Sequence, residues 1–145
     1  MNNIPRRKPL NANIGVIGVG LDTYWDQFEG LYEVMLDKMN TFKGLLEPHA
    51  VNVSDFGIID NAQKAYAVLP RLKAADLDLL FIDMVTYATS ATFGVIARSL
   101  DVPIVLVALQ PLAAMDYANA KTFIQLCNDD YCSVPEFTGV AVRMG

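Results

Sequence analysis

The chain has 145 residues, of which 53% are hydrophobic and 19% charged, a balance that excludes an intrinsically disordered protein. This length fits one domain with its own buried core. The formal net charge of −5 argues against a nucleic-acid partner, because phosphate binding needs clustered Lys and Arg, and the chain has 11 of these in total. We expect an N-terminal tail over residues 1–12, which includes the basic run 6–8, and a single α/β domain over residues 13–145.

Apolar runs in the sequence are all shorter than the roughly 20 residues that a membrane-spanning helix needs, so no membrane partner is expected. The first residues lack an obvious signal-peptide cleavage site, which favours cytoplasmic localisation. Cys127 and Cys132 lie in a polar stretch without a nearby His, which is the wrong number and spacing of ligands for a zinc site. We therefore expect two free thiols and no metal site in this chain.

The N-terminal half begins with a short β-branched segment, residues 13–19, which predicts a buried strand. Over residues 22–46 the apolar side chains recur at intervals of three and four, which predicts a long amphipathic helix. Asp22 or Thr23 is the expected N-cap of this helix. Residues 49–53 are expected to form a second strand.

The next segments continue this alternation after a loop through Gly57. They are expected over residues 61–75 (helix), 78–83 (strand), 90–100 (helix) and 103–108 (strand). Pro70 predicts a kink or a split in the first of these helices. Strands that alternate with helices and read as continuous Val, Ile and Leu runs are typical of a parallel sheet covered on both faces. The predicted fold class is therefore α/β, a three-layer, flavodoxin-like (Rossmann-like) sheet of four or five strands in the order 2-1-3-4.

The pattern weakens after Gln110. A helix over residues 117–126 and a polar loop over residues 127–135 are expected, followed by an apolar segment over residues 137–144. This last segment is not typical of a polar C-terminal tail, which predicts that the chain is the first domain of a longer polypeptide.

Three glycines near the first strand, Gly15, Gly18 and Gly20, have the spacing GxxGxG. A dinucleotide-binding turn has the order GxGxxG, and Asp22 would repel a pyrophosphate at the start of the following helix. We interpret these glycines as small residues that let the strand pass close to a helix. The prediction is that the chain binds neither NAD nor a flavin.

Two acidic residues, Asp22 and Asp83, follow the first and third predicted strands. Such a pair could hold a divalent cation as in a receiver domain, which is one alternative for the function of the chain. A receiver-like site would also need a second acidic residue after the first strand and a lysine after the late strand, and neither is present. The structural alternative for Asp83 is a residue that caps the loop it enters.

Hydroxyl and amide side chains gather at the predicted carboxyl edge of the sheet, where open α/β folds bind ligands. We predict that Thr86, Tyr87 and Gln110, beside Asp22 and Tyr24, bind a polyol substrate.

Structural roles are the alternative for each of these residues. Gln110 could bond to loop backbone, and Thr89 or Ser90 could cap the following helix. No catalytic residues are predicted, because His49 is the single histidine and no Ser-His-Asp or Cys-His arrangement can form around it.

The chain resembles the N-terminal domain of the L-arabinose and L-fucose isomerase superfamily, and L-arabinose isomerase most closely. The resemblance covers nearly the whole chain through diffuse motifs. The matching residues are Thr86-Tyr87, Gln110, Glu136-Phe137 and Arg143-Met144. The chain departs from the family pattern at Gly20, where the family has Gln, and at Ala88-Thr89, where it has Ser-Pro.

This resemblance implies a flavodoxin-like domain that caps the sugar site of a neighbouring subunit in a homo-oligomer. The implied enzyme interconverts an aldose and a ketose with a divalent metal, usually manganese, held by Glu and His residues of later domains. The chain alone is then expected to be inactive and to hold no cofactor. The alternative is a stand-alone flavodoxin-like or receiver-like domain that binds a small molecule or takes part in signalling.

Overall fold

A computed structural model describes residues 11–49 and 51–145 of the chain. Most of the expected N-terminal tail lies outside these residues. The strands are β1 (Ala12–Val19), β2 (Val51–Ile59), β3 (Leu79–Met84) and β4 (Ile104–Val107). The helices are the 3-10 turn η1 (Asp22–Tyr24) and α1 (Leu31–Leu46), α2 (Ala62–Ala74), α3 (Ser90–Ser99), α4 (Thr122–Leu126) and α5 (Val134–Met144). None of the helices in the described ranges has the length and apolar character that a membrane crossing requires.

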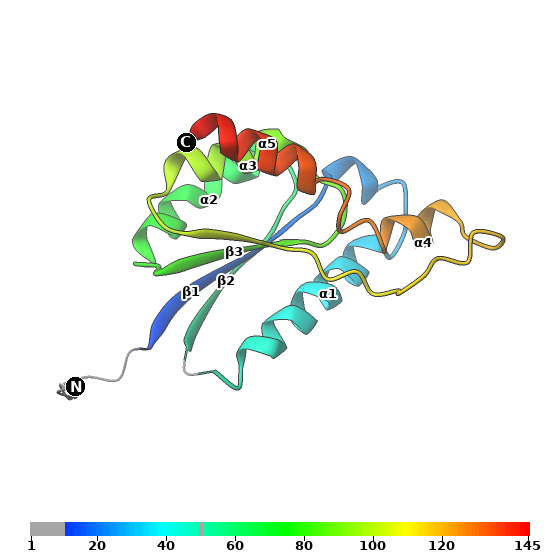
Figure 1. The fold of residues 1–145 in the computed structure, drawn as a ribbon, viewed down its shortest axis with the longest axis horizontal. Coiled ribbons are helices and arrows are strands. Elements are labelled where there is room, and N and C mark those ends of the chain that lie inside the picture. The colour runs from blue at the N-terminus through cyan, green and yellow to red at the C-terminus, as the bar shows by residue number, and fades with distance from the viewer. Residues whose placement is uncertain (1–10, 50) are drawn as a thin grey trace, which may run out of the picture.

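The four strands form one parallel sheet in the order β2-β1-β3-β4, which confirms the predicted α/β class and strand order. Figure 1 shows α1 on one face of the sheet and α2, α3 and α5 on the other, so the molecule has three layers. The architecture is flavodoxin-like. Helix α4 and the segment before it extend beyond the sheet as a projecting arm, residues 108–128.

The side chains of β3 alternate between the two faces of the sheet, as the pleat requires. Leu80, Ile82 and Met84 are fully buried beneath α2, α3 and α5. Phe81 belongs to the second cluster of apolar side chains, which packs against α1. The same alternation places Asp83 on the α1 side of the sheet, and this side chain is also buried.

The predicted long first helix is wrong at its start. Residues 22–24 form a 3-10 turn, and α1 begins only at Leu31, after Gly30 at φ 80°. Asp22 and Thr23 therefore do not cap α1. The helix-like spacing of apolar residues extends upstream of α1 because Trp25 and Phe28 also pack against the apolar cluster beneath α1.

The predicted second strand is too short, and the predicted loop at Gly57 is wrong. Strand β2 continues to Ile59, with Gly57 at φ 79° inside it. Val16 pairs with Asp55 and Gly18 pairs with Ile58, so β2 has one extra residue at this point. Such a bulge accommodates a glycine with positive φ without ending the strand.

Later elements also differ in length from those predicted. Helix α2 runs without a break from Ala62 to Ala74, so the predicted split at Pro70 is wrong. The proline removes a hydrogen bond to the carbonyl of Tyr66, and both residues are exposed, so solvent can replace that bond. The helix expected over residues 117–126 is shorter and begins at Thr122.

The glycines of the GxxGxG pattern lie where β1 is tightly packed. A Cβ on Gly18 would lie 3.1 Å from Cγ1 of Ile58 and 3.2 Å from Sδ of Met39 in α1. A Cβ on Gly20 would lie 2.9 Å from the ring of Trp25. These close approaches account for both glycines through packing against neighbouring side chains.

Helix α3 is capped by a side chain from a distant part of the sequence. Thr89 occupies the N-cap position but makes no side-chain cap bond, and the amide of Ser90 donates to Oε1 of Glu136 at 2.8 Å. Thr89 is thus the N-cap by position, as expected, but the side chain that bonds to the first turn of α3 is that of Glu136. The carboxylate of Glu136 in α5 links the start of α3 to the start of α5, and this contact lowers the pKa of Glu136.

Replacing Glu136 by Ala should lower the free energy of unfolding by about 0.5–1 kcal/mol at neutral pH, because the first turn of α3 loses its acceptor. The pKa of Glu136 is lowered in the folded state, so this contribution is present above the unfolded pKa and disappears as the pH falls through the folded pKa. Urea unfolding at a series of pH values measures the difference. Glu136→Gln, which keeps an acceptor oxygen, is the control and should lose less; an equal loss in both variants would contradict a capping role.

Candidate functional site

The carboxyl ends of all four strands lie at one edge of the sheet, and the predicted site residues follow those ends. The chain leaves β1 toward β2 on one side and reaches β3 on the other, so the topological switch point lies between β1 and β3. Open α/β sheets bind ligands at this position. Asp83 pairs with Gly18 across these two strands and therefore lies beside the switch point.

Asp22 and Tyr24 lie in the turn after β1. Oδ2 of Asp22 accepts a hydrogen bond from Nδ2 of Asn61 at 2.8 Å, which joins the ends of β1 and β2. Burial raises the pKa of the Tyr24 hydroxyl, and the nearby groups Asp129 and Tyr87 raise it further. Asp129 and Tyr87 therefore lie near Tyr24 at this edge, and a binding role for Tyr24 and Tyr87 stays a prediction.

Thr86 and Gln110 lie at the same edge, but the hydrogen bonds described for them go to the backbone. The Thr86 side chain is fully buried, and its Oγ1 donates to the carbonyl of Leu126 at 2.9 Å, which holds α4 against the loop after β3. Gln110 is exposed, and its Nε2 donates to the carbonyl of Leu112 at 3.2 Å. This bond leaves Oε1 and the second hydrogen of Nε2 of Gln110 unused.

A buried carboxylate, Asp60, follows β2 and was not singled out from the sequence. Its Oδ2 accepts from Nε1 of Trp25 at 2.8 Å and lies 2.6 Å from the ammonium of Lys64. Asp60 is fully buried, whereas the Lys64 side chain is half exposed. Through these contacts with Trp25 and Lys64, Asp60 fixes the turn after β1 against the start of α2.

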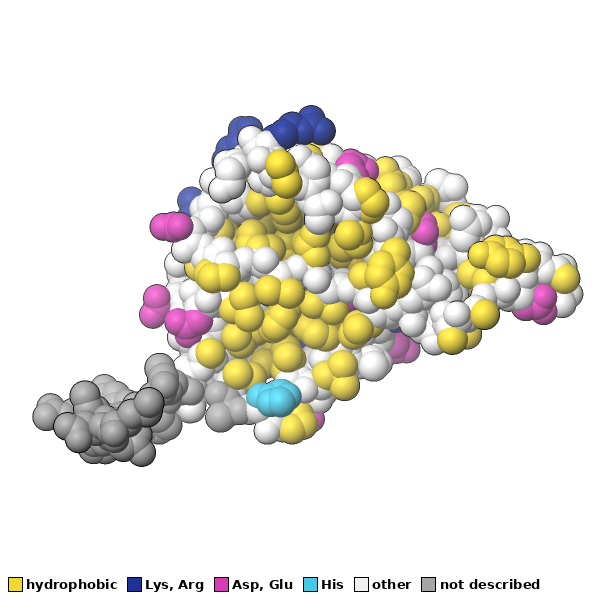
Figure 2. All heavy atoms as spheres, in the orientation of Figure 1, with side chains coloured by type: hydrophobic (Ala, Val, Ile, Leu, Met, Phe, Trp, Pro, Cys, Tyr) yellow, Lys and Arg dark blue, Asp and Glu magenta, His cyan; other side chains and the backbone are white. Residues whose placement is uncertain are grey.

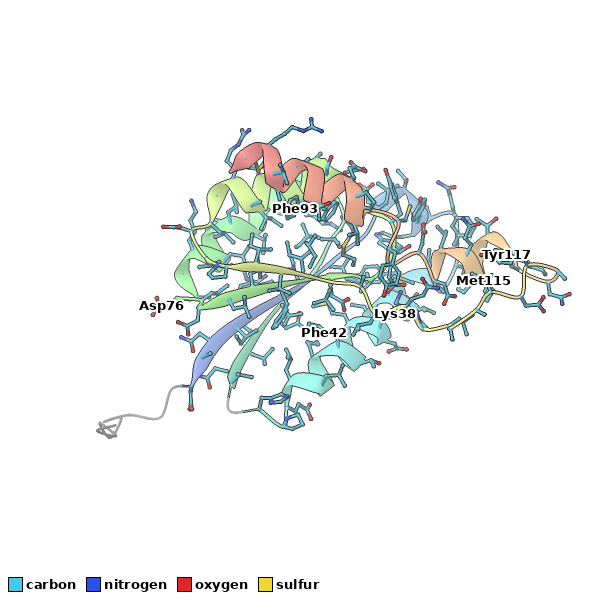
Figure 3. The ribbon with its side chains drawn as sticks, in the orientation of Figure 1. Lys38, Phe42, Asp76, Phe93, Met115 and Tyr117 are labelled. Atoms are coloured by element: carbon cyan, nitrogen blue, oxygen red, sulfur yellow. The ribbon has the colours of Figure 1, made fainter. Side chains whose placement is uncertain are left out.

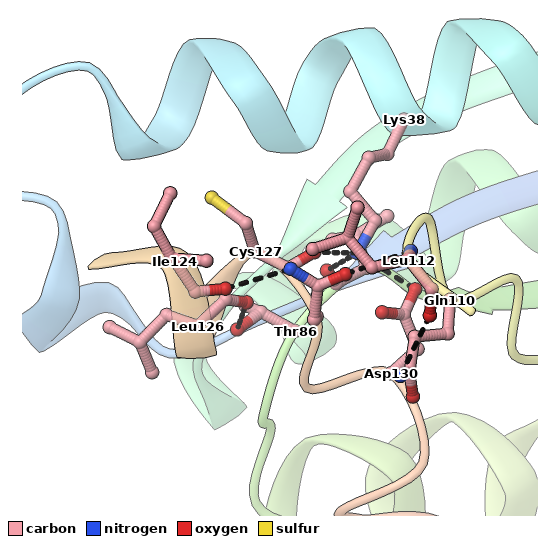
Figure 4. Close-up of polar contacts among 10 residues, drawn as sticks. Lys38, Thr86, Gln110, Leu112, Ile124, Leu126, Cys127 and Asp130 are labelled. Atoms are coloured by element: carbon pink, nitrogen blue, oxygen red, sulfur yellow. Dashed lines mark hydrogen bonds and ion pairs between the residues drawn. The ribbon is translucent and has the colours of Figure 1, made fainter. Parts of the chain in front are cut away.

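Lys38 is the most connected polar side chain at the carboxyl edge. It reaches from α1 toward the end of the sheet, as Figure 3 shows. Its Nζ donates to the carbonyls of Val85, at 2.5 Å, and Cys127, at 3.0 Å. The same atom lies 2.7 Å from Oδ1 of Asp130 (Figure 4). Lys38 thereby joins α1, the loop after β3 and the segment between α4 and α5.

Asp130 is buried with Lys38 as an ion pair. Its side chain is 1% exposed, and that of Lys38 is 12% exposed. Burial raises the pKa of Asp130, and Lys38 opposes that rise. Neither carboxylate oxygen has a hydrogen-bond partner of good geometry in the described part of the chain, so the contact with Lys38 is an ion pair.

Asp83 is a second buried carboxyl beside this ion pair. Burial raises its pKa to about 7, the charge of Lys38 lowers it and the charge of Asp130 raises it. The side chain is 3% exposed, and no group in residues 11–49 or 51–145 forms a hydrogen bond with its carboxylate. The expectation that Asp83 caps a loop is therefore wrong, because Ser133 and Glu136 bond to the amides of the loop instead.

A cavity of about 490 Å³ opens above Asp83, between α1 and the projecting arm. Its apolar walls consist of Val34, Leu109, Pro111, Leu112 and Ile124. Its polar lining comes from Asp37, Lys38 and Thr41 of α1, Asp83, and Cys127 and Asn128 after α4. This volume lies within the range of roughly 300–1,000 Å³ that is usual for small-molecule sites.

The described residues contain no group of three or more His, Cys, Asp or Glu placed to hold a metal ion. At Asp130 the Lys38 ammonium lies within ion-pair distance of the carboxylate, where a cation would otherwise bind. Manganese thus does not fit this cluster as the structure has it. Cys127 and Cys132 are both free thiols.

A scan against protein-family models finds no match to this chain, and a search of curated proteins finds no relative.

Lys38 and Asp130 could have been suspected from one signal in the sequence. Lys38 lies one helical turn from Val34 and one from Phe42, on a face that is otherwise apolar. A charge in that position has to find a partner in the interior. The sequence does not reveal that the partner is Asp130, because 92 residues separate the two in the chain.

Proposed function

We propose that the chain is the N-terminal, substrate-capping and oligomerisation domain of a metal-dependent aldose-ketose isomerase of the L-arabinose isomerase type. The observation that carries this proposal is the projecting arm, whose apolar side chains are exposed beside the polar carboxyl edge. The domain is not catalytic alone, and the divalent metal, manganese in the proposal, is held by other domains of a cytoplasmic enzyme.

The projecting arm extends well beyond the rest of the domain, and Figure 3 shows Met115 and Tyr117 near its far end. Tyr117 is 87% exposed, and Leu109, Leu112 and Ile124 are each more than 40% exposed. Exposed apolar side chains that are contiguous on a surface mark interaction sites. An arm of this kind supports a domain that covers a site on a neighbouring subunit.

Polar groups at the base of the arm support the capping role. Tyr87 lies near Tyr24 there, and Gln110 lies near the start of the arm itself. Hydroxyl and amide groups bind sugar hydroxyls by hydrogen bonds, and the apolar arm would exclude water around them. We assign substrate positioning to these residues and proton transfer to groups outside this chain.

The proposal is tested by expressing the complete coding sequence from which the chain derives. The purified product should convert L-arabinose or L-fucose to the ketose in the presence of Mn²⁺, and the 145-residue chain assayed in parallel should not. A complete product without further domains, or without isomerase activity on either sugar, would overturn the proposal.

Replacing Gln110 by Ala in the complete enzyme should lower kcat/KM by about 2-fold to 13-fold, since one hydrogen bond to an uncharged sugar is worth about 0.5–1.5 kcal/mol. Metal affinity should remain unchanged. Asp101→Asn is the matched control, because Asp101 is exposed and precedes β4 at the opposite edge of the sheet. If Gln110→Ala leaves kcat/KM unchanged for both sugars, Gln110 does not contact the substrate.

A further inference from the structure

We propose that the cavity between α1 and the projecting arm binds a small organic cation, in which an ammonium group joined to an apolar body donates a hydrogen bond to the carboxylate of Asp83. The cavity shares Leu109, Leu112 and Ile124 with the projecting arm, but its lining includes none of the residues assigned to sugar positioning, Tyr24, Tyr87 and Gln110. The proposal rests on the cavity, its buried carboxyl and the distribution of charge around it.

The floor of the cavity carries a carboxyl without a hydrogen-bond donor. Asp83 lines the cavity, its side chain is 3% exposed, and no described residue forms a hydrogen bond with it. Buried carboxylates in folded proteins are normally satisfied by donors, and one that is left without a donor has a large desolvation cost. A ligand that brings a donor would remove that cost.

Lys38 cannot act as this donor in the arrangement described. A lysine ammonium has three hydrogens. The Nζ of Lys38 donates to the carbonyls of Val85 and Cys127, and it lies 2.7 Å from Oδ1 of Asp130, which compensates its charge. Its charge affects Asp83 only through space, so a second cation can be accommodated.

The charges around the cavity favour a cation over an anion. Asp37 lies at the exposed side of the cavity, Asp83 at its floor and Asp130 behind it, and Lys38 is the single cation in the lining. Because Lys38 is paired with Asp130, the negative charges of Asp37 and Asp83 are left without a partner of opposite sign in the lining. An anion would meet a field of its own sign.

The walls of the cavity favour a ligand with an apolar body. Leu109, Leu112 and Ile124 are exposed large side chains that face the cavity together with Val34 and Pro111. Covering these side chains would remove apolar surface from water, which favours binding. A sugar or another polyol has no apolar surface to cover these walls. An arylalkylamine has an aromatic ring for the walls and an ammonium group for the carboxylate of Asp83.

Titration of the chain with 2-phenylethylamine tests the proposal, with 2-phenylethanol as the neutral probe of similar shape. Calorimetry near pH 8 should show the amine binding at least about tenfold more tightly than the alcohol. An ion pair with a buried carboxylate contributes more than about 1.4 kcal/mol, which corresponds to a tenfold change in affinity. Amide NMR shifts should change in α1 and the projecting arm. Equal affinity for both probes, no binding, or shifts confined to other regions would overturn the proposal.

Asp83→Asn keeps the size of the side chain and removes its charge. It should weaken amine binding at least about tenfold and leave the alcohol unaffected. Asp37→Asn, at the exposed side of the cavity, is the matched control and should change the affinity by less than about threefold because solvent screens its charge. Unchanged amine binding in folded Asp83→Asn would contradict the assignment.

The pH dependence provides an independent readout. Burial raises the pKa of Asp83 to about 7, so the protein must lose this proton before it binds the amine. The apparent affinity should fall about tenfold for each unit below pH 7, because the amine itself stays protonated. The charged or titratable groups that face Asp83 are Lys38 and Asp37 of α1, Cys127 after α4, and Asp130. Asp83→Asn should abolish the fall, and a fall that persists in this variant would assign the titration to one of those groups and overturn the role of Asp83.

Discussion

Replacing Lys38 by Met is expected to lower the free energy of unfolding by about 3–5 kcal/mol near pH 8, which is typical for removing one partner of a buried ion pair. The substitution leaves the carboxylate of Asp130 buried without its cation. It also removes the donor to the carbonyls of Val85 and Cys127. Urea unfolding of the variant and the natural chain measures the loss.

Lys43→Met is the matched control for this experiment. Lys43 lies on the same helix, α1, and forms an ion pair with Asp55, in which both side chains are partly exposed. Exposed ion pairs contribute about 0–1 kcal/mol, so Lys43→Met should have a small effect. Adding Asp130→Asn to Lys38→Met should recover part of the stability, because no carboxylate then remains unpaired. A loss below about 1 kcal/mol for Lys38→Met would show that the pair does not hold α1 in place.

Asp83→Asn is expected to stabilise the protein at pH 8 by on the order of 4 kcal/mol and to have little effect near pH 4. The pKa of Asp83 is raised from 3.8 to about 7 in the folded state. Between pH 3.8 and about 7 the folded protein binds more protons than the unfolded chain. The stabilisation from the protonated carboxyl is therefore complete below pH 3.8 and is lost as the pH rises to about 7. The amide of Asn stays neutral and avoids this loss.

Urea unfolding at several pH values between 4 and 8 measures this difference between the two proteins. Asp37→Asn is the control, since Asp37 lines the same cavity but is exposed, and it should keep the pH dependence of the natural chain. If the free energies of unfolding of the natural chain and of Asp83→Asn change with pH in parallel, the pKa of Asp83 is not raised.

The fold could be predicted because β1, β3 and β4 are nearly continuous apolar runs, and β1 and β3, which lie inside the sheet, are also the most buried strands. The end of β2 could not be predicted in the same way. Its exposed middle is polar, and Gly57 reads as a loop unless the bulge opposite Val16 and Gly18 is known. Likewise, the apolar spacing of α1 continues into Trp25, although that residue packs from a turn.

The candidate site could be predicted only as far as the edge of the sheet on which it lies. The strand order brings Thr86 and Gln110 to the carboxyl edge, but the sequence does not state that the Thr86 hydroxyl bonds to the carbonyl of Leu126. The ion pair of Lys38 with Asp130 depends on tertiary packing, and so does the raised pKa of Asp83. The spacing of Lys38 indicates that it faces the interior, but it does not identify Asp130 as its partner or describe the surroundings of Asp83.

The two edge strands of the sheet differ in how they meet solvent. Along β2 the exposed residues 52–55 are mostly polar, and they include the charged Asp55. Along β4, Val105 is 41% exposed, and Figure 2 shows apolar side chains gathered between the α3 and α5 layer and α1. Polar and charged residues discourage the addition of a further strand, whereas an apolar edge admits it. A strand of another chain can therefore be added to the sheet at β4 but is disfavoured at β2. Under conditions that promote aggregation, the protein should associate through the β4 edge alone.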